Sequence, residues 1–278
     1  MANNIIPKII HCVWLSGDEK PPLIQECLSS WKKIMPDYEI HEWGMKDVAH
    51  INSSFLKGAI KARKWAFATD FLRVYLLYHY GGICMDLDVY AYRSLDPFLS
   101  HRAFSGIEFW PVMFYKSFRK SNVQGIGIDA AIMGAEKGHS WIKDILSFYN
   151  DKDFVNTSDF YMQFIMPNVI ANISHLNYGF KYIPVFQVLN DDVYLYPPDV
   201  FSACCNRNLF GETSQNYYLE LGNLNQMRYT CHLCSNSWGY VVKTTRWQKI
   251  KFQIKKIVLQ LLGKSFVNLL KNFFNYKN

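Results

Sequence analysis

One stretch, residues 66–90, constrains the fold of this chain more than any other. Its first half, AFATDFLRVYLLYHY, repeats apolar residues at spacings of three and four, which predicts an amphipathic helix. Gly81 and Gly82 then end the helix, because glycine adopts the backbone conformations that close a helix at little cost. The apolar run at 83–85 is typical of a short buried strand. The sequence therefore predicts a helix that turns directly into a strand of a sheet.

Two carboxylates, Asp86 and Asp88, follow where this strand leaves the core. In an extended chain, residues two apart share a face, so the two like charges repel each other unless a cation lies between them. Mg2+ and Mn2+ bind through one or two carboxylates together with substrate phosphates. Ligands of open α/β sheets bind beyond the carboxyl ends of strands, which is where both aspartates are expected. An isolated Asp-x-Asp is also typical of a solvated turn, so the motif alone leaves both interpretations open.

The composition is that of a globular protein with a substantial core. The chain has 278 residues, of which 50% are hydrophobic and 17% aromatic. No apolar run reaches the 18 or so residues of a membrane span, and the N-terminal sequence lacks a signal-peptide pattern, so we expect a cytoplasmic location. The seven cysteines are an odd number spread over a large chain. They favour reduced thiols over a disulfide framework.

The excess positive charge is confined to the C-terminal end. Residues 246–278 contain eight Lys or Arg and no acidic residue, whereas the rest of the chain is close to neutral. The apolar spacing there predicts a basic amphipathic helix, which either contacts an anionic membrane surface or docks on the preceding domain. We therefore expect two parts, a catalytic domain over 1–245 and a helical tail over 246–278. No nucleic-acid partner is expected, because the tail lacks a recognisable nucleic-acid-binding module.

Strands and helices alternate along the rest of the chain. Strands are expected within 6–17, at 38–43, 103–109, 182–185 and 193–196. Helices are expected at 23–34, from about 140 to 149, and at 158–173 with a kink at Pro167; short helices and loops are expected over 45–64. The segment 125–139 contains many small residues and is expected only to lead into the helix that follows. This alternation is typical of the α/β class.

The helix, the double glycine and the two aspartates together resemble one known family. The pattern is that of the DxD-motif glycosyltransferases of family 32, which include Och1-type mannosyltransferases and capsular polysaccharide enzymes, with clostridial glucosylating toxins as distant relatives. It is carried here, in order, by Asp70, Arg73, Gly81, Gly82, Asp86 and Asp88. The resemblance implies a GT-A type, Rossmann-like α/β sheet flanked by helices that binds a nucleotide sugar. It also implies transfer that retains the anomeric configuration.

The resemblance also implies roles for individual residues. Asp86 and Asp88 would hold Mn2+ or Mg2+ together with His232, whose sequence HLCSNSW resembles the family's His-x(4)-Ser-Trp signature. The residues implied to act in catalysis are Asp86, Asp88, Asp70 and Arg73. Those implied to contact the nucleotide sugar are Val13, Trp14, Asp70, Arg73, Asp129, Ser237 and Trp238.

For three of these positions other interpretations stay open. Trp14 is also compatible with core packing, and Asp129 with a helix cap or another structural role. Cys231 and Cys234 flank the histidine as a C-x-x-C pair, which would suit zinc, but the adjacent Cys204 and Cys205 do not have the spacing of two further ligands.

The expected function is transfer of a sugar from a UDP- or GDP-sugar to a glycan or lipid-linked glycan. This would serve the synthesis of cell-surface polysaccharide, capsular or lipopolysaccharide, at the inner face of the cytoplasmic membrane. One alternative is a phosphatase of the haloacid dehalogenase type, but Tyr90 stands where such enzymes have Thr or Val, and they have no use for Asp70 and Arg73. The other is a non-catalytic, membrane-associated protein that binds nucleotide sugars.

Overall fold

A computed structural model describes residues 4–110, 113–114, 125–202 and 227–233 of the chain. They belong to one compact unit, Met1–Trp238. Cys234, Ser237, Trp238 and the tail expected at 246–278 lie outside the described residues, so the expected division at residue 245 stays a prediction.

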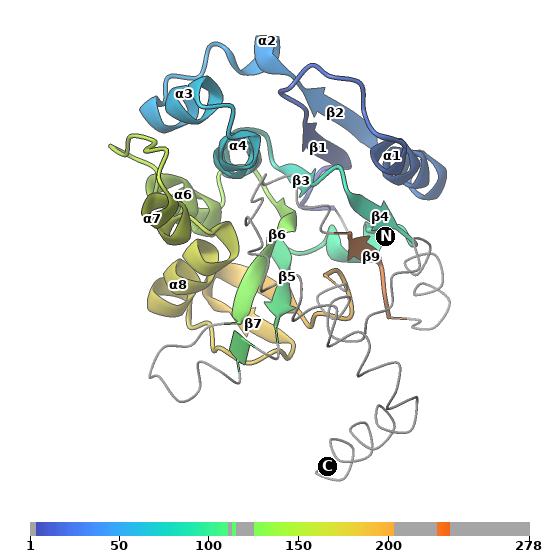
Figure 1. Ribbon diagram of the computed structural model, residues 1–278. Helices are drawn as coiled ribbons and strands as arrows, with labels where there is room; N and C mark the ends of the chain where they lie inside the picture. Colours follow the sequence, from blue (N-terminus) through green and yellow to red (C-terminus); the bar gives the residue numbers. More distant parts are fainter. Residues whose placement is uncertain (1–3, 111–112, 115–124, 203–226, 234–278) are drawn as a thin grey trace, which may run out of the picture. The chain divides into compact units, whose positions relative to one another are not determined.

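The unit is built on a seven-stranded mixed sheet with the order β2-β1-β3-β6-β5-β8-β7 (Figure 1). Parallel pairs join β2 to β1, β1 to β3 and β5 to β8, whereas β6 is antiparallel to both of its neighbours and β7 is antiparallel to β8. Strands β1, β3 and β5 therefore run in one direction, and their carboxyl ends lie at the same edge. The strands are β1 (Ile9–Val13), β2 (Glu39–Trp43), β3 (Gly82–Met85), β5 (Ala103–Phe109), β6 (Ile126–Ala135), β7 (Gln187–Leu189) and β8 (Val193–Tyr196).

Helices flank this sheet, which confirms the expected α/β class. Helices α3, α4, α6, α7 and α8 gather on one side in Figure 1, and α1 lies on the other side near a small sheet of β4 and β9. None of the described helices is long and apolar enough to span a membrane. Their bounds are α1 (Pro22–Ile34), α2 (Met45–Val48), α3 (Ser54–Lys61), α4 (Trp65–Tyr80), α6 (Ser140–Ser147), α7 (Ser158–Gln163) and α8 (Met166–Tyr178); β4 is Val89–Ala91 and β9 is Thr230–His232.

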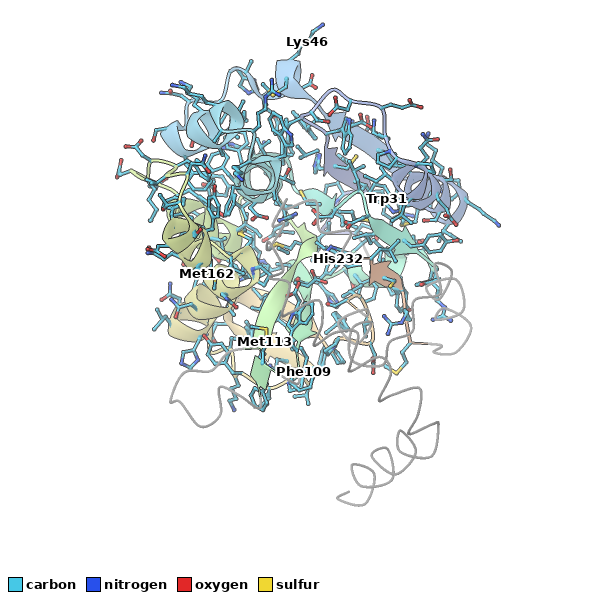
Figure 2. All side chains as sticks on the ribbon, in the orientation of Figure 1. Trp31, Lys46, Phe109, Met113, Met162 and His232 are labelled. Carbon is cyan, nitrogen blue, oxygen red and sulfur yellow. The ribbon has the colours of Figure 1, made fainter. Side chains whose placement is uncertain are left out.

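The core has one apolar cluster on each side of the sheet. The larger cluster joins α4, α6 and α8 to the strands and includes the fully buried Trp141. The smaller one includes Trp31 of α1, whose indole Nε1 donates to the carbonyl of Val89 at 2.7 Å. Figure 2 shows Trp31 between α1 and β4. Helix α1 thus holds β4, and with it the chain that leaves β3.

The helix-to-strand turn forms as the sequence predicts. Gly81 and Gly82 have φ of 70° and 97°, a range that disfavours residues with a side chain. A Cβ atom on Gly82 would lie 2.7 Å from the backbone oxygen of Ile9, and one on Gly81 would lie 2.8 Å from the backbone nitrogen of Lys137. Both glycines are therefore required by close backbone approach as well as by conformation.

Three of the sequence-based expectations are wrong. Residues 126–135 were expected only to lead into a helix, but they form β6. All ten residues of β6 are buried, so the strand shows none of the alternation that marks a half-exposed strand. The strand expected at 182–185 is absent from the described chain and pairing begins only at Gln187; Pro184 has no N–H to donate to a ladder. The helix expected over 158–173 is divided into α7 and α8, because Pro167 can begin a helix but not continue one.

Candidate functional site

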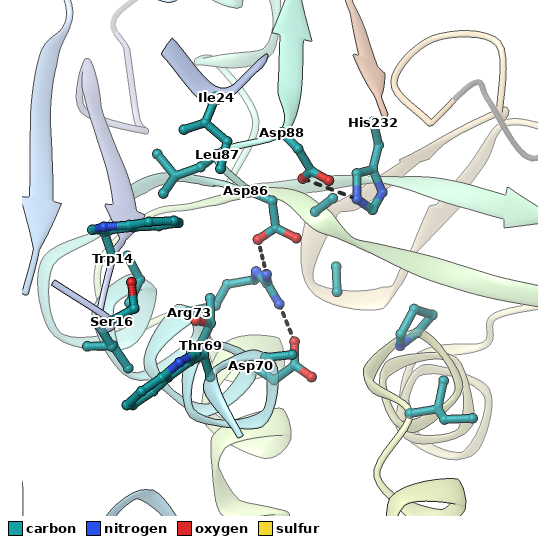
Figure 3. A pocket seen from close by; sticks show the side chains of 18 of the residues that line it. Trp14, Ser16, Ile24, Thr69, Asp70, Arg73, Asp86, Leu87, Asp88 and His232 are labelled. Carbon is teal, nitrogen blue, oxygen red and sulfur yellow. Dashed lines mark hydrogen bonds and ion pairs between the residues drawn. The ribbon is translucent and has the colours of Figure 1, made fainter. Parts of the chain in front are cut away.

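A cavity of about 460 Å³ opens at the edge where β1, β3 and β5 end (Figure 3). It combines acidic groups with three indole rings, Trp14, Trp65 and Trp110. The other lining residues are Val13, Leu15, Ser16, Asp18, Ile24, Ala66, Thr69, Asp70, Arg73, Asp86, Leu87, Asp88, Glu108, Ala130, Ala131, Ile165, Pro167 and His232. Seven of the residues predicted from the sequence therefore meet in one cavity: Val13, Trp14, Asp70, Arg73, Asp86, Asp88 and His232.

A chain of two ion pairs joins helix α4 to the end of β3. Asp70 and Arg73 lie one helical turn apart, and Arg73 Nη1 donates to Asp70 Oδ1 at 2.8 Å. The other terminal nitrogen, Nη2, donates to Asp86 Oδ1. Figure 3 shows Arg73 between the two carboxylates. A single buried guanidinium thus fixes both acids, and a contact between Arg73 and a phosphate stays a prediction.

Asp70 keeps one oxygen without a partner. The residue is only 5% exposed, and Oδ2 has no hydrogen-bond partner among the described residues. Burial raises the pKa of Asp70 to about 6, although the attraction of Arg73 opposes the shift. The carboxylates of Asp86 and Asp70 raise the pKa of Arg73 despite its burial, so the guanidinium stays charged. A buried oxygen without a partner is costly, and in a cavity a ligand hydroxyl would satisfy it.

Asp86 and Asp88 lie in a turn and not in the extended chain that the sequence analysis assumed. The backbone N–H of Asp86 donates to the carbonyl of Ala131 on β6 at 2.8 Å. The N–H of Val89 then donates back to the carbonyl of Asp86 at 2.9 Å, which closes the turn. The correction concerns the local backbone only, because both side chains still line the cavity.

His232 reaches this turn through the pairing of β9 with β4. The register places His232 opposite Val89, and the N–H of Leu233 donates to the carbonyl of Asp88 at 3.0 Å. His232 Nε2 lies 3.5 Å from Asp88 Oδ1. Side-chain ligand atoms of Asp86, Asp88 and His232 lie within 4.8 Å of one another. Two carboxylates and an imidazole are a fitting donor set for a divalent ion such as Mn2+.

Trp14 marks the opposite end of the cavity from His232 (Figure 3). It follows β1 directly, and its indole Nε1 donates to the carbonyl of Asp18 at 2.8 Å. The ring is partly exposed, and Lys20 Nζ lies 5.6 Å from its centre. The indole therefore belongs to the cavity wall, together with Val13, more than to the core. The predicted contacts of Ser237 and Trp238 lie outside the described residues.

Asp129 lies behind the cavity wall. It is fully buried and is absent from the lining residues. Its Oδ1 accepts from the N–H of Ala131 at 2.8 Å, and its Oδ2 accepts from the hydroxyl of Ser202 at 2.6 Å. These bonds support the irregular part of β6, which lies opposite β5. This part includes Ala131, whose carbonyl accepts a hydrogen bond from the N–H of Asp86. The geometry therefore gives Asp129 a positioning role beneath the aspartate turn; its predicted contact with sugar hydroxyls stays a prediction.

Glu108 and Trp110 are cavity residues that the sequence analysis did not select. Glu108 lies on β5, and its carboxylate is within 4.8 Å of ligand atoms of both Asp129 and His232. Burial, and then repulsion by Asp129, raises the pKa of Glu108 to about 8. A signal was present in the sequence, because Glu108 interrupts the otherwise uncharged strand AFSGIEF just before a tryptophan.

The described part of the chain gives no support to a zinc site at the C-x-x-C pair. Cys231 is fully buried and packs with Cys27 and Leu233. Among the described residues, the two groups able to hold a metal ion contain no cysteine.

Residues 21–105 match the family described as "Glycosyltransferase sugar-binding region containing DXD motif". The matched region contains α4, the double glycine and the aspartate turn. It therefore includes all six residues that carry the family resemblance in the sequence, among them Asp70, Arg73, Asp86 and Asp88.

Two curated yeast proteins are similar to half of the chain. Inositol phosphoceramide mannosyltransferase 3 of Schizosaccharomyces pombe is 30% identical over 145 residues, which are 51% of this chain and 36% of that protein. Mannosyl phosphorylinositol ceramide synthase CSH1 of Saccharomyces cerevisiae is 27% identical over 156 residues, or 51% and 35%. The chain thus spans about a third of the length of these relatives.

Solved glycosyltransferase structures are also similar to this chain, at lower sequence identity. PaToxG glycosyltransferase has a TM-score of 0.44 and 15% identity, over 62% of this chain and 69% of its own. Galactosyltransferase LgtC, solved with donor and acceptor sugar analogues, has a TM-score of 0.39 and 12% identity, over 81% and 87%.

Proposed function

We propose that this chain is a metal-dependent glycosyltransferase of the GT-A type, which transfers a sugar from a nucleoside-diphosphate sugar to a hydroxyl group with retention of configuration. The observation that carries the proposal is Asp70, which lines the same cavity as the Asp-x-Asp turn and whose buried Oδ2 has no partner among the described residues. The match of residues 21–105 to a DXD-containing sugar-binding region supports it. The yeast relatives favour a mannosyl donor.

The cavity supplies the parts that this reaction needs. Asp70 Oδ2 accepts a hydrogen bond from a hydroxyl of the donor sugar, and Arg73 keeps Asp70 and Asp86 in place. Trp14 offers an aromatic face for the nucleotide base. Asp86, Asp88 and His232 would hold Mn2+ or Mg2+. An ion held there would supply positive charge to offset the negative charge of the departing diphosphate, which is the largest catalytic effect expected here.

The phosphatase alternative is not favoured. In that chemistry the first aspartate of Asp-x-Asp attacks phosphorus as a nucleophile, but Asp86 Oδ1 here accepts a hydrogen bond from the buried Arg73 guanidinium. A carboxylate paired in this way is a weaker nucleophile. A phosphatase also has no need for the unpaired oxygen of Asp70.

The biological setting remains part of the proposal. We propose an acceptor on a glycan or lipid-linked glycan, in the synthesis of a cell-surface polysaccharide. A protein that acts on such an acceptor would work at the inner face of the cytoplasmic membrane. The names of the yeast relatives, which refer to an inositol phosphoceramide, favour a lipid-linked acceptor over a free sugar.

The first experiment is a thermal-shift screen of nucleoside-diphosphate sugars with and without Mn2+, because a ligand at about 100 times its Kd adds about 2.7 kcal/mol to stability. Asp88→Ala should abolish the Mn2+-dependent shift and lower sugar transfer by about 100-fold or more, while the melting temperature without ligand stays close to that of the unchanged chain. Asp153→Asn, at an exposed position away from the cavity, is the matched control. Full transfer activity of Asp88→Ala would overturn the proposal.

A further inference from the structure

Glu108 is a cavity carboxylate to which the proposed reaction assigns no role. Among the described residues, its side chain makes one long hydrogen bond, in which Trp110 Nε1 donates to Oε2 at 3.4 Å. Within the described part of the chain, Oε1 has no hydrogen-bond partner. A partly buried carboxyl group that faces a cavity in this state gains stability from a ligand that hydrogen-bonds to it.

The position of Glu108 separates it from the nucleotide end of the cavity. Trp14 follows β1, the aspartate turn follows β3, and Glu108 lies near the end of β5. In the sheet, β3 and β6 lie between β1 and β5. Figure 3 shows Trp14 and His232 on opposite sides of Asp86 and Asp88. Because Glu108 lies within 4.8 Å of a ligand atom of His232, it belongs to the end beyond the metal ligands. A donor whose base stacks on Trp14 therefore directs its sugar towards Glu108.

An apolar wall stands beside Glu108. It consists of Trp110 and of Ile165 and Pro167 at the start of α8. Glu108 pairs with Gly127 across the β5–β6 ladder, and a Cβ atom on Gly127 would lie 2.9 Å from Pro167. Because paired residues share a face of the sheet, the missing side chain of Gly127 lets α8 approach close to Glu108. The packing of α8 against Gly127 thus fixes the position of this wall beside Glu108.

This combination suits a particular kind of ligand. A pyranose or cyclitol ring has an apolar face of C–H groups and a rim of hydroxyl groups. An indole and a proline ring can cover the face, while a carboxyl group bonds one or two hydroxyls of the rim. A flat apolar ligand would leave Glu108 without a partner, and a phosphate would be repelled by the carboxylates around it.

We propose that Glu108 and Trp110 form the acceptor subsite, in which the Glu108 carboxyl group hydrogen-bonds to a ring hydroxyl of a sugar or cyclitol acceptor whose apolar face lies on Trp110. This inference rests on the proposed transferase function and adds the class of acceptor to it. Glu108 positions the acceptor beside the donor sugar, and no bond to Glu108 forms or breaks in the reaction.

The test compares two reactions of the 278-residue chain with Mn2+ and GDP-mannose, UDP-glucose or UDP-galactose as donor. One is release of nucleoside diphosphate by transfer to water, which needs no acceptor site. The other is transfer to methyl α-mannoside, methyl β-galactoside or myo-inositol. Glu108→Ala should raise the KM of the acceptor by about ten- to hundredfold and change donor hydrolysis by no more than about twofold. Glu108→Gln should restore part of the loss, because an amide still bonds a hydroxyl.

The outcomes are distinguishable. Glu39→Gln, a change of an exposed glutamate on the outer strand β2, should leave both reactions unaltered. An acceptor KM that is the same in Glu108→Ala and in the unchanged chain would overturn the inference alone, as would an equal loss of hydrolysis and transfer in both Glu108 variants. Absence of turnover with every donor would overturn the proposed function, and the inference with it. Saturation-transfer NMR should detect binding of the acceptor probes in the presence of Mn2+ and GDP. This binding should likewise be lost in Glu108→Ala.

Discussion

At the scale of single residues, buried polar side chains hold the chain in place before and after β3. His11 on β1 illustrates this, since it is 2% exposed and bonds on both ring nitrogens. Its Nε2–H donates to the carbonyl of Gly81 at 2.8 Å, and its Nδ1 accepts from the indole N–H of Trp43 at 3.1 Å. The contact with Trp43 requires the neutral ring, because a protonated Nδ1 cannot accept, whereas the bond from Nε2–H to Gly81 is compatible with either state. The same imidazole that anchors the turn before β3 is thus sensitive to acid.

His11 should make the folded protein less stable in mildly acidic solution. Burial lowers the pKa of His11 from about 6.5 to about 4. Between these values the unfolded chain binds a proton that the folded chain does not, so stability is complete above pH 6.5 and falls as the pH drops towards 4. The loss amounts to about 3 kcal/mol. Urea unfolding at several pH values should show it, and His11→Gln should flatten the curve while His41→Gln, on the neighbouring strand, should not. An unchanged pH dependence in His11→Gln would contradict the assignment.

The Asp70–Arg73–Asp86 chain predicts an asymmetry between single and double changes. Arg73→Leu leaves the buried Asp70 without its partner and should cost about 3–5 kcal/mol of unfolding free energy. Adding Asp70→Asn removes the unpaired charge and should recover part of that cost, so the two changes are not additive. The half-exposed pair of Arg102 and Glu136 is the control, since Arg102→Leu should cost no more than about 1 kcal/mol. Additive losses in chemical denaturation would show that the two side chains do not stabilise each other.

At the scale of secondary-structure elements, the step from α4 to β3 decides where the aspartates lie. Gly82→Ala forces a Cβ atom against the backbone oxygen of Ile9, so β3 must move away from β1. Gly138 offers a matched control, because it has a similar positive φ of 78° but nothing within 4 Å of its Cβ position. Gly138→Ala should cost about 1–2 kcal/mol for the backbone alone.

Gly82→Ala should then cost at least about 2 kcal/mol more than the control, because it adds a backbone clash to the conformational cost. It should also weaken the thermal shift caused by Mn2+ and a nucleotide sugar, since Asp86 and Asp88 follow β3. Equal melting temperatures for Gly82→Ala and Gly138→Ala would contradict this explanation of the double glycine.

The elements that were predictable from the sequence are those whose burial is one-sided or whose ends are marked. Helix α1 lies between Pro21 and Pro36, and α4 ends at the double glycine, so both were found nearly to the residue. Strand β6 was missed because it is buried on both faces and made of small residues, which gives no periodic signal. The turn at Asp86 was also not predictable, because the carbonyl of Ala131 that fixes it belongs to that missed strand.

At the scale of the whole molecule, the candidate site is assembled from distant parts of the chain. Sequence patterns find the residues that lie close together, such as Asp70, Arg73, Asp86 and Asp88. His232 was found only through its resemblance to a family signature, and the structure brings it to Asp88 through the pairing of β9 with β4. Glu108 lies at the junction of β5, α8 and the aspartate turn, so its role depends on the sheet order that the sequence did not reveal.

The charge of the whole chain leads to the last prediction. The eight basic residues of 246–278 carry the entire excess charge, and each Lys or Arg near an anionic membrane contributes about 1 kcal/mol. Changing Lys255, Lys256, Lys264 and Lys271 to Gln should therefore weaken binding to phosphatidylserine-containing vesicles by about 1000-fold in a flotation assay. The matched control changes four exposed lysines of the unit Met1–Trp238, namely Lys32, Lys33, Lys57 and Lys61. A tail that instead docks on the domain would leave vesicle binding equally weak in both proteins, and its four changes would lower the melting temperature.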